Sequence, residues 1–508
     1  MIQGLLDLAT RKPVGFIAMF CALHTIVIFL TSAWSLSLPN DMLENLYWGK
    51  EWQMGYYKHP PFFAWVSEGF VRMCGGYRHL AAYYLLTPMF HSAFFVCIFG
   101  VVRNFLTMRN AVLSIVFLEG ILFHNACFRF NANSALFLTY GLMIWSCYYA
   151  IIRVTWQRNW YLWIIFGIAA GCSMLTKYSS AIMILCCVLV LFGTKEGRKQ
   201  LCNPFLYVGG ICAALVLIPH VLWLFANDFL PFKYLDAQTR PHITYLAKLT
   251  ARLWYPARYA SFQILMCLPL VIASCIMFKL RRNWSKRLDF NGMFLVYAGV
   301  MPTVCVMMSA IIFGIEIGRF WGMMFCGLLP ACLFYFFEIS QNKVIPACRV
   351  VLSFFVAIMG LCCLGAICGP SEPVHGIAEF VDSTWKQVDG RRLKYVYCAG
   401  KMDPCVSLAV YSKNDPSVLF ARDGSLSSGH GASLSPWVTE ADLMANGFVM
   451  VFNYSIASIN DLPAKYAALL RNRHYILQAR KFETEYRFNF VRRFSKPEVY
   501  DMTFIFVK

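Results

Sequence analysis

Charge is scarce in this chain. Only 14% of its 508 residues are Asp, Glu, Lys or Arg, whereas 59% are hydrophobic. A typical soluble domain carries about 25% charged residues, so the composition excludes an ordinary soluble protein. Many apolar runs reach the roughly 18 residues that a membrane-spanning helix requires. We therefore expect a polytopic α-helical membrane protein.

Metal-binding and nucleic-acid-binding signatures are also lacking. The 21 cysteines lie mostly in apolar runs, where cysteine acts as a small hydrophobe, and no paired CxxC spacing predicts a structural zinc site. Many of the basic residues behind the net charge of +19 sit in short loops, with no zinc-finger or RNA-binding motif beside them. We expect no nucleic-acid partner and assign no cofactor, and the sequence leaves the role of a divalent metal open.

About eleven apolar runs are candidate membrane helices, although the two that flank Lys177 are short. Arg11 and Lys12 precede the first run and no small-residue cleavage site follows it, so we expect an uncleaved helix. Basic residues in alternate short loops predict an inside N-terminus and an outside C-terminal portion. The predicted spans are 13–35, 80–102, 111–128, 133–152, 160–175, 179–194, 204–226, 259–279, 290–314, 321–338 and 348–368.

The composition changes near Gly369, where a Pro- and Ser-containing linker begins and acidic residues become frequent. Short apolar runs alternate there with helix-like segments, a pattern typical of a small α/β domain. We therefore divide the chain into a membrane domain, 1–368, and a C-terminal domain, 369–508. Outside the cytoplasm, Cys398 and Cys405 either form a disulfide or remain thiols. The apolar runs are 395–397, 417–420, 447–452 and 504–507, and one helix-like segment is 462–471.

Unusual polar residues fall in the loops that this topology places on the outer side. Ionisable groups beside lipid are costly and usually mark function. The first outer loop holds Asp41, Glu44, Lys58 and His59. The later loops add Arg129, Asn131, Asn133, Lys177, Tyr178, Arg319 and Trp321. We expect these residues to converge on one surface.

This set of side chains suits group transfer from a lipid phosphate. Charge-assisted contacts to phosphate are strong, so the cations Lys58, Arg129, Lys177 and Arg319 are candidates for holding a phosphate leaving group. Asp41 is a candidate for taking a proton from an attacking hydroxyl, a role in which position matters before pKa.

Each candidate also has a plainer explanation. Asp41 can cap the helix that follows it, and Glu44, one turn later, can be a solvated surface residue. Lys177 and Arg319 can extend from helix ends to the membrane surface. His59, which precedes two prolines, can simply hold a turn.

Two further features of the apolar regions have structural explanations. Trp48, Trp52 and Tyr56 in the first loop suit the aromatic belt at a membrane interface, although they can also stack on a sugar ring. Glu119 lies near the middle of the third span, where an ionisable residue is a functional candidate by default. We expect it to hydrogen-bond a neighbouring helix instead.

The first loop also carries a family resemblance. An Asp-x-x-Glu segment at 41–44 is followed by Gly-Tyr-x-x-His-Pro-Pro-x-x-Ala-Trp at 55–65. This combination resembles the first outer loop of bacterial type C glycosyltransferases of the protein O-mannosyltransferase-like superfamily, which includes the lipid A aminoarabinose transferases. Weaker similarities lie at 130–134, 171–178, 223–229 and 319–321, and the resemblance covers about residues 10–368.

The resemblance implies amphipathic helices in the first loop, a polyprenyl-phosphate sugar as donor and an acceptor at the outer face. By that resemblance Asp41 matches the family's first-loop aspartate, and Lys177 and Arg319 match basic positions for the lipid phosphate. The sequence departs from the family twice. Met42 follows Asp41 where relatives often have Glu, and Lys58 stands where many relatives carry an acid. Both departures leave the second carboxylate and any metal role open.

We therefore predict an enzyme of the bacterial inner membrane that transfers a sugar from polyprenyl phosphate. The acceptor would be lipid A, a core sugar or another envelope glycan at the periplasmic face. The alternative is a transporter or flippase of a lipid-linked sugar; transporters often show internal repeats, and none is evident in this sequence. The sequence names neither the sugar nor the acceptor.

Overall fold

The structure is a computed structural model whose chain divides into two compact units. A membrane unit comprises Met1–Ser32, Tyr84–Val221 and Leu235–Cys362, and a first-loop unit comprises Ala33–Tyr83, Leu222–Tyr234 and Cys363–Lys508. The residues described are 2–121, 129–153, 156–239, 245–279, 288–314, 316–318, 320–399, 402–420, 434–488 and 497–508.

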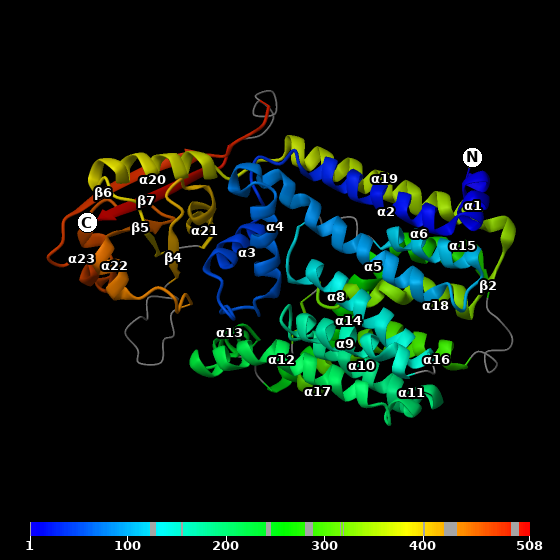
Figure 1. Cartoon of the computed structure of the whole chain (residues 1–508). Helices are drawn as coiled ribbons and strands as arrows, with labels where there is room; N and C mark the ends of the chain where they lie inside the picture. Colours follow the sequence, from blue (N-terminus) through cyan, green and yellow to red (C-terminus); the bar gives the residue numbers. More distant parts are fainter. Residues whose placement is uncertain are drawn as a thin grey trace. The chain divides into compact units, whose positions relative to one another are not determined.

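Helices dominate the membrane unit (Figure 1). Most of its long helices are apolar on nearly all sides, as expected for helices that meet lipid on one side and protein on the other. Its helices are α1 (Ile2–Arg11), α2 (Pro13–Ser32), α5 (Leu86–Val102), α6 (Met108–Val116), α8 (Ala132–Ile152), α9 (Trp156–Met174), α10 (Ser180–Gly193), α11 (Lys195–Gln200), α12 (Pro204–Ala226), α14 (Tyr245–Met266), α15 (Leu268–Met277), α16 (Phe290–Leu295), α17 (Met301–Phe313), α18 (Leu329–Phe336) and α19 (Val344–Cys368). Strands β1 (Phe278–Lys279) and β2 (Glu338–Ile339) pair antiparallel.

Within the described residues, six helices are long and apolar enough to cross a membrane. A seventh span results if α14 and α15, which meet at a 67° bend, are counted together. The chain is therefore a multi-pass membrane protein, and the number of eleven spans stays a prediction. The expected span at 111–128 differs most, because α6 ends at Val116, a 3-10 turn follows at Phe117–Gly120, and residues 122–128 lie outside the described chain.

Close helix packing forms the core of the membrane unit. A Cβ on Gly141 of α8 would lie 3.2 Å from the Cα of Phe94 in α5, so glycine permits this tight contact. Helices α2 and α19 lie side by side (Figure 1), and Thr31 Oγ1 donates to Met359 Sδ over 3.9 Å. Glu119 Oε1 lies 2.7 Å from His24 Nδ1 of α2, which confirms the predicted hydrogen bond to a neighbouring helix.

The first loop folds into two packed helices, α3 (Asn40–Glu51) and α4 (Phe62–Met73), followed by a 3-10 segment, Gly76–Leu85. A Cβ on Gly49 would lie 2.6 Å from the carbonyl oxygen of Ala64, so only glycine allows α3 to approach α4 this closely. Trp48 and Tyr56 are fully buried and stack with ring centroids 5.1 Å apart. The loop therefore has an aromatic core of its own.

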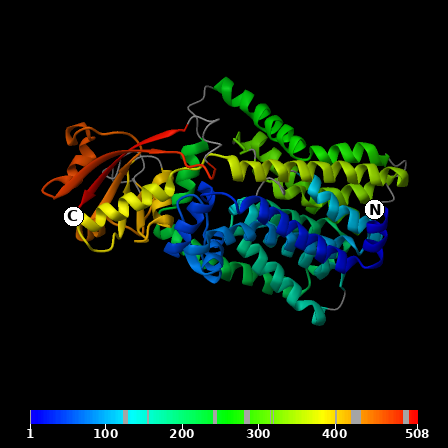
Figure 2. The ribbon, with the colours of Figure 1, turned by 90° about the horizontal axis from the view of Figure 1, so that it is seen from above.

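The C-terminal segment contains a five-stranded sheet in the order β4-β3-β5-β7-β6 (Figure 2). Strand β3 pairs parallel with β4 and β5, and β7 pairs antiparallel with β5 and β6. The strands are β3 (Tyr395–Cys398), β4 (Ser417–Phe420), β5 (Phe448–Phe452), β6 (Tyr475–Glu483) and β7 (Val499–Val507); the helices are α20 (Val374–Val388), α21 (Met402–Tyr411), α22 (Glu440–Asn446) and α23 (Ala464–Leu470).

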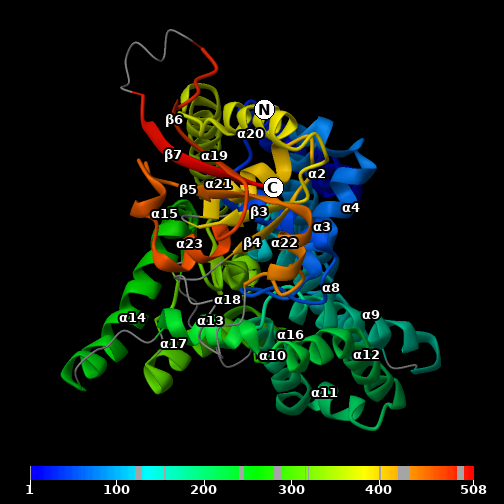
Figure 3. The ribbon, with the colours of Figure 1, turned by 90° about the vertical axis from the view of Figure 1, so that its left-hand side faces the viewer.

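Helices cover both faces of this sheet, α20 on one side and α22 and α23 on the other (Figure 3). Successive residues of a strand point to opposite faces. Phe504 and Phe506 of β7 accordingly contact Phe380 of α20, whereas Ile505 and Val507 join the core beneath α22 and α23. The four apolar runs noted in the sequence coincide with strands β3, β4, β5 and β7, and β6 was missed because its side chains are mostly exposed or half-buried.

The C-terminal segment packs on the first loop. Tyr47 OH donates to the carbonyl oxygen of Val418 over 2.7 Å, and Leu38 N donates to Tyr411 OH over 2.9 Å. These contacts explain why the two segments belong to one compact unit. The division at residue 368 into two independent domains stays a prediction.

Candidate functional site

Helix α3 presents two carboxylates on one face. Asp41 and Glu44 are three residues apart, and this spacing places side chains together on a helix surface. The helix begins at Asn40 after Pro39, so Asp41 is not the N-cap and the capping explanation is wrong. It lies in the first helical turn, where a negative charge is favoured by the helix dipole. Both carboxylates are half-buried.

Glu44 is held by two donors from the motif at 55–61. Tyr57 OH donates to Glu44 Oε1 over 2.9 Å, and Lys58 Nζ donates to Glu44 Oε2 over 2.9 Å. Burial raises the pKa of Glu44 above its ordinary value of 4.5, while the Lys58 ammonium acts in the opposite direction. These two hydrogen bonds fix the position of the Glu44 carboxylate. Glu44 is therefore not the solvated surface residue of the plainer explanation.

A cavity of about 180 Å³ opens beside these groups in the first-loop unit. It is large enough for several water-sized groups, and its wall combines acid, base and aromatic side chains. Tyr57 and Tyr234 meet edge to face at this wall, with ring centroids 5.0 Å apart. The residues that line it are Asn40, Asp41, Leu43, Glu44, Tyr57, Lys58, Tyr234 and Val406.

The remaining first-loop candidates form a packed core. The His59 ring lies edge-on to Trp48 and Phe63, with ring centroids 6.3 Å and 5.6 Å away, and the His59 carbonyl accepts from Tyr56 N over 3.0 Å. This agrees with its explanation as a turn residue. The membrane-belt expectation is wrong for Trp48 and Tyr56, because both are buried in protein; Trp52 is exposed.

In the membrane unit, residues from three predicted outer loops meet around Lys177. Its Nζ donates to Asn133 Oδ1 over 2.7 Å and lies 5.3 Å from the centre of the Trp321 ring. Lys177 is only 9% exposed, so its ammonium does not extend to water as the helix-end explanation requires. Asn133 and Trp321 are uncharged, and these two contacts orient the ammonium.

The neighbouring candidates take other positions in the membrane unit. Asn131 is the N-cap of α8, accepting from Asn133 N over 2.9 Å and Ser134 N over 3.2 Å. The carbonyl of Arg129 accepts from Ser134 Oγ over 2.8 Å, while the Arg129 side chain is exposed.

Tyr178 and Arg319 complete the predicted set. Tyr178 OH and His220 Nε2 are 2.9 Å apart, a partnership that nothing in the sequence indicated. Arg319 lies outside the described residues, so its predicted phosphate contact stays a prediction. Among the described residues, no group of three His, Cys, Asp or Glu side chains is placed to hold a metal ion.

Five of the lining residues were not predicted: Asn40, Leu43, Tyr57, Tyr234 and Val406. Asn40 and Leu43 directly adjoin the predicted Asp41 and Glu44 in sequence. Tyr57 lies inside the recognised first-loop motif, and its proximity to Lys58 could have suggested it. Tyr234 of α13 (Leu230–Thr239) and Val406 of α21 reach the cavity only through the tertiary fold. No local sequence pattern marks either of them.

Comparisons with known proteins support the family resemblance of the chain. Residues 58–223 match the family model described as dolichyl-phosphate-mannose-protein mannosyltransferase. The chain is 22% identical over 193 residues to the lipid A galacturonosyltransferase RgtD of Rhizobium johnstonii, covering 37% of this chain and 38% of that protein. It is 22% identical over 237 residues to the lipopolysaccharide core galacturonosyltransferase RgtB of the same organism, covering 46% and 47%. The matched region thus spans less than half the length of these curated relatives.

The fold of the chain is similar to that of a solved protein. The crystal structure of ArnT from Cupriavidus metallidurans in the apo state superposes with a TM-score of 0.55 at 14% identity, covering 97% of this chain and 98% of that one. A second structure, of the same protein bound to undecaprenyl phosphate, gives a TM-score of 0.51 at 13% identity, with the same coverage. These two matches show the fold, and the family model and the sequence relatives bear out the resemblance to type C membrane glycosyltransferases.

Proposed function

We propose that this protein is a glycosyltransferase that moves a sugar from a polyprenyl-phosphate donor to a glycolipid or glycan acceptor. The observation that carries the proposal is the cavity in which Asp41 and Glu44 face Lys58 and two tyrosines. The likeness to galacturonosyltransferases and to a protein solved with undecaprenyl phosphate supports the same chemistry. No observation favours a transporter.

Asp41 is the proposed general base. A base must lie within hydrogen-bond reach of the proton it removes, and Asp41 lines the cavity and matches the first-loop aspartate of the family resemblance. Glu44 is tied to Tyr57 and Lys58 by hydrogen bonds. We therefore assign proton removal to Asp41 and acceptor binding to Glu44 and Lys58.

The proposed reaction is a direct displacement at the anomeric carbon. The acceptor hydroxyl oxygen forms a bond to this carbon while the bond from the carbon to the phosphate oxygen breaks. The hydroxyl proton passes to the Asp41 carboxylate, and polyprenyl phosphate leaves with the bonding electron pair. Attack opposite the leaving group inverts the configuration at that carbon.

Lys177 is the proposed phosphate-binding residue. Burial of a cation strengthens its electrostatic attraction to a phosphate, because little water screens the two charges. Asn133 holds the ammonium in place, and the indole of Trp321 supports its charge through a cation–π contact. We extend the same role to Arg319, as the family resemblance implies, and place Arg129, Asn131 and Tyr178 at the periphery of this site.

The proposed location is the bacterial inner membrane, with the first loop and the C-terminal segment on the periplasmic face. The distribution of basic residues in short loops supports this orientation. The acceptor would then be an envelope glycolipid such as lipid A or its attached core, as in the named relatives.

Sugar transfer by membranes that contain Asp41→Asn tests the proposal. The substitution keeps the size of the side chain but removes the base, so we expect a loss of about 100-fold or more in transfer from a labelled polyprenyl-phosphate sugar. Asp501→Asn is the matched control, because Asp501 makes an exposed ion pair with Lys481 that contributes little. Full activity of Asp41→Asn at wild-type protein levels would rule out the assignment.

A further inference from the structure

One wall of the Asp41 cavity comes from the C-terminal segment. Val406 lies in α21 and is 4% exposed, yet it lines the same cavity as Asp41 and Glu44. The other lining residues come from α3, the adjoining motif and α13. The cavity is therefore complete only when the C-terminal segment lies against the first loop.

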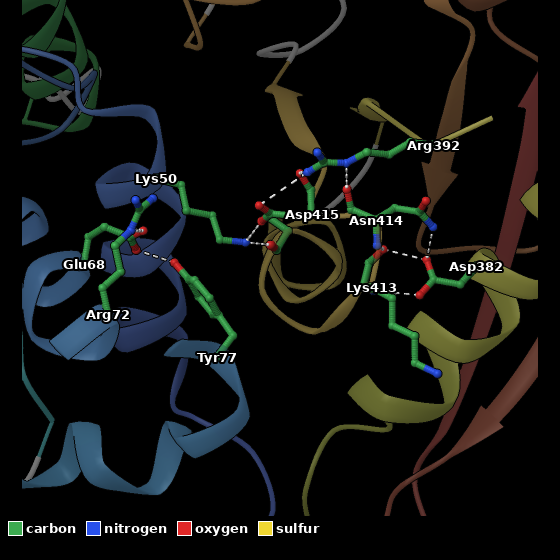
Figure 4. Close-up of polar contacts among 11 residues, drawn as sticks. Lys50, Glu68, Arg72, Tyr77, Asp382, Arg392, Lys413, Asn414 and Asp415 are labelled. Atoms are coloured by element: carbon green, nitrogen blue, oxygen red, sulfur yellow. Dashed lines mark hydrogen bonds and ion pairs between the residues drawn. The ribbon is translucent and has the colours of Figure 1, made fainter. Parts of the chain in front are cut away.

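Lys50 joins α3 to this wall. Its ammonium donates to the carbonyl oxygen of Ala409 in α21 and to the carboxylate of Asp415 (Figure 4). The same ammonium lies 4.2 Å from the centre of the Tyr77 ring. Lys50 follows Glu44 by six residues on the same helix, so these contacts fix the helix that carries both carboxylates.

The turn that presents Asp415 is itself tightly held (Figure 4). Asp382 of α20 accepts from Ser412 Oγ over 2.6 Å, from Lys413 N over 2.8 Å and from Asn414 Nδ2 over 2.8 Å. Asp415 adopts a positive φ of 54°, a conformation that few non-glycine residues take. A side chain fixed in this way is a rigid anchor for Lys50.

On the first-loop side, a buried acid fixes Tyr77. Glu68 of α4 is completely buried; it accepts from Arg72 Nε over 2.6 Å and from Tyr77 OH (Figure 4). The Tyr77 ring that faces Lys50 is thus oriented by α4. Asp415 in the C-terminal segment and Tyr77 in the first loop are thus both fixed by hydrogen bonds. Together they set the position of the Lys50 ammonium.

We propose that the C-terminal segment sets which acceptor the Asp41 cavity admits, with Val406 as a specificity-determining residue and Lys50 as a positioning residue. This inference rests on the proposed transfer reaction. An acceptor bound beside Asp41 would meet the Val406 side chain, and its size would decide which acceptor fits. Lys50 would keep α3, and with it Asp41, at the correct distance from that wall.

The test uses the full-length protein in a deletion strain, with mass spectrometry of the envelope glycolipids. The variants are Val406→Ala and, as a matched control, Val410→Ala. Val410 lies one turn further along α21 and is also 4% exposed, but it does not line the cavity. We expect Val406→Ala to change the ratio of sugar-modified acceptors by about tenfold, the effect of about a methyl-sized change in an apolar pocket, and Val410→Ala to leave it unchanged.

The outcomes separate the two proposals. If the wild-type gene restores no sugar modification to the deletion strain, the proposed function fails. If it does restore the modification, and Val406→Ala and Val410→Ala give the wild-type ratio at equal protein levels, the inference on specificity is overturned.

Lys50 is tested by the split between KM and kcat. With lipid A as acceptor probe and a labelled polyprenyl-phosphate sugar as donor, we expect Lys50→Met to raise the acceptor KM about fivefold to tenfold and to leave the donor KM unchanged. Lys50→Arg, which keeps the cation, should recover most of this loss. Asp415→Asn keeps an oxygen acceptor and guards against misfolding; unchanged acceptor KM in both Lys50→Met and Asp415→Asn would refute the positioning role.

Discussion

Two lysines, one in each unit, are held in different ways. In the first-loop unit, Lys58 pairs with the carboxylate of Glu44 over 2.9 Å. In the membrane unit, Lys177 donates to the neutral amide of Asn133 over 2.7 Å and faces the Trp321 ring. The carboxylate partner of Lys58 carries a charge opposite to that of the lysine, whereas the amide partner of Lys177 is neutral. The first arrangement suits the shaping of a cavity, and the second suits the binding of an anion.

Among the substitutions that test this comparison, we expect replacement of Lys177 to cause the largest loss of activity and of lipid-phosphate binding. A hydrogen bond to a charged group contributes about 1.5–3 kcal/mol, so Lys177→Met should lower kcat/KM by about 10- to 100-fold. Binding of undecaprenyl phosphate, measured by calorimetry on the detergent-solubilised protein, should weaken in parallel. Lys58→Met should leave that binding nearly unchanged. Equal loss of lipid-phosphate binding in both variants would remove the distinction between the two lysines.

Asn133→Asp should have the second-largest effect, because it makes the surroundings of Lys177 resemble those of Lys58. A carboxylate at this position would pair with the ammonium and repel a phosphate. We expect binding of undecaprenyl phosphate to weaken by about tenfold or more. Asn133→Ala is the matched control, since it removes one hydrogen bond without adding charge and should cost only about fivefold. An aspartate variant that binds the lipid phosphate like the alanine variant would contradict the role of charge.

Glu44→Gln should have the smallest effect on rate, about tenfold at neutral pH, and a distinct effect on pH dependence. Burial raises the pKa of Glu44, so the wild-type carboxylate takes up a proton as pH falls through that raised value, and Lys58 then loses its ionised partner. We expect wild-type activity to fall there and the Glu44→Gln profile to be flatter. Glu440→Gln, at an exposed position in the same unit, should keep the wild-type profile.

The same pKa shift has a consequence for stability. Because the folded protein binds this proton more tightly than the unfolded chain, the stabilisation from protonated Glu44 is present at low pH and lost as pH rises through the raised pKa. Glu44→Gln should therefore not lower the melting temperature at neutral pH through loss of charge. A marked fall in melting temperature would show that the Glu44–Lys58 pair is mainly structural.

The sequence predicted groups that are near one another along the chain better than groups brought together by folding. The motif at 41–61 revealed Asp41, Glu44 and Lys58 because all three residues lie in the same loop of the sequence. The meeting of Asn133, Lys177 and Trp321 followed from alternating loops alone, without any shared motif. The local motif thus predicted most of the first-loop site, and the predicted topology of the loops predicted most of the site around Lys177.

The contacts that α13 and α21 make at the cavity of the first loop were not predicted. Val406 and Tyr234 enter the cavity through tertiary packing, and neither lies in a recognised sequence motif. Trp48 and Tyr56 were expected at a lipid interface, yet both are buried in protein. An aromatic residue gains from leaving water in either setting, so composition cannot distinguish a lipid from a protein neighbour.

The first-loop unit is assembled from three stretches of chain separated by membrane helices. Proteins are synthesised from the N-terminus, and early segments fold first. Helix α3 is therefore synthesised long before Val406 and Asp415. A polypeptide that stops short of α21 carries Asp41 but lacks one wall of its cavity, so interrupted synthesis yields an unfinished site instead of an unselective enzyme.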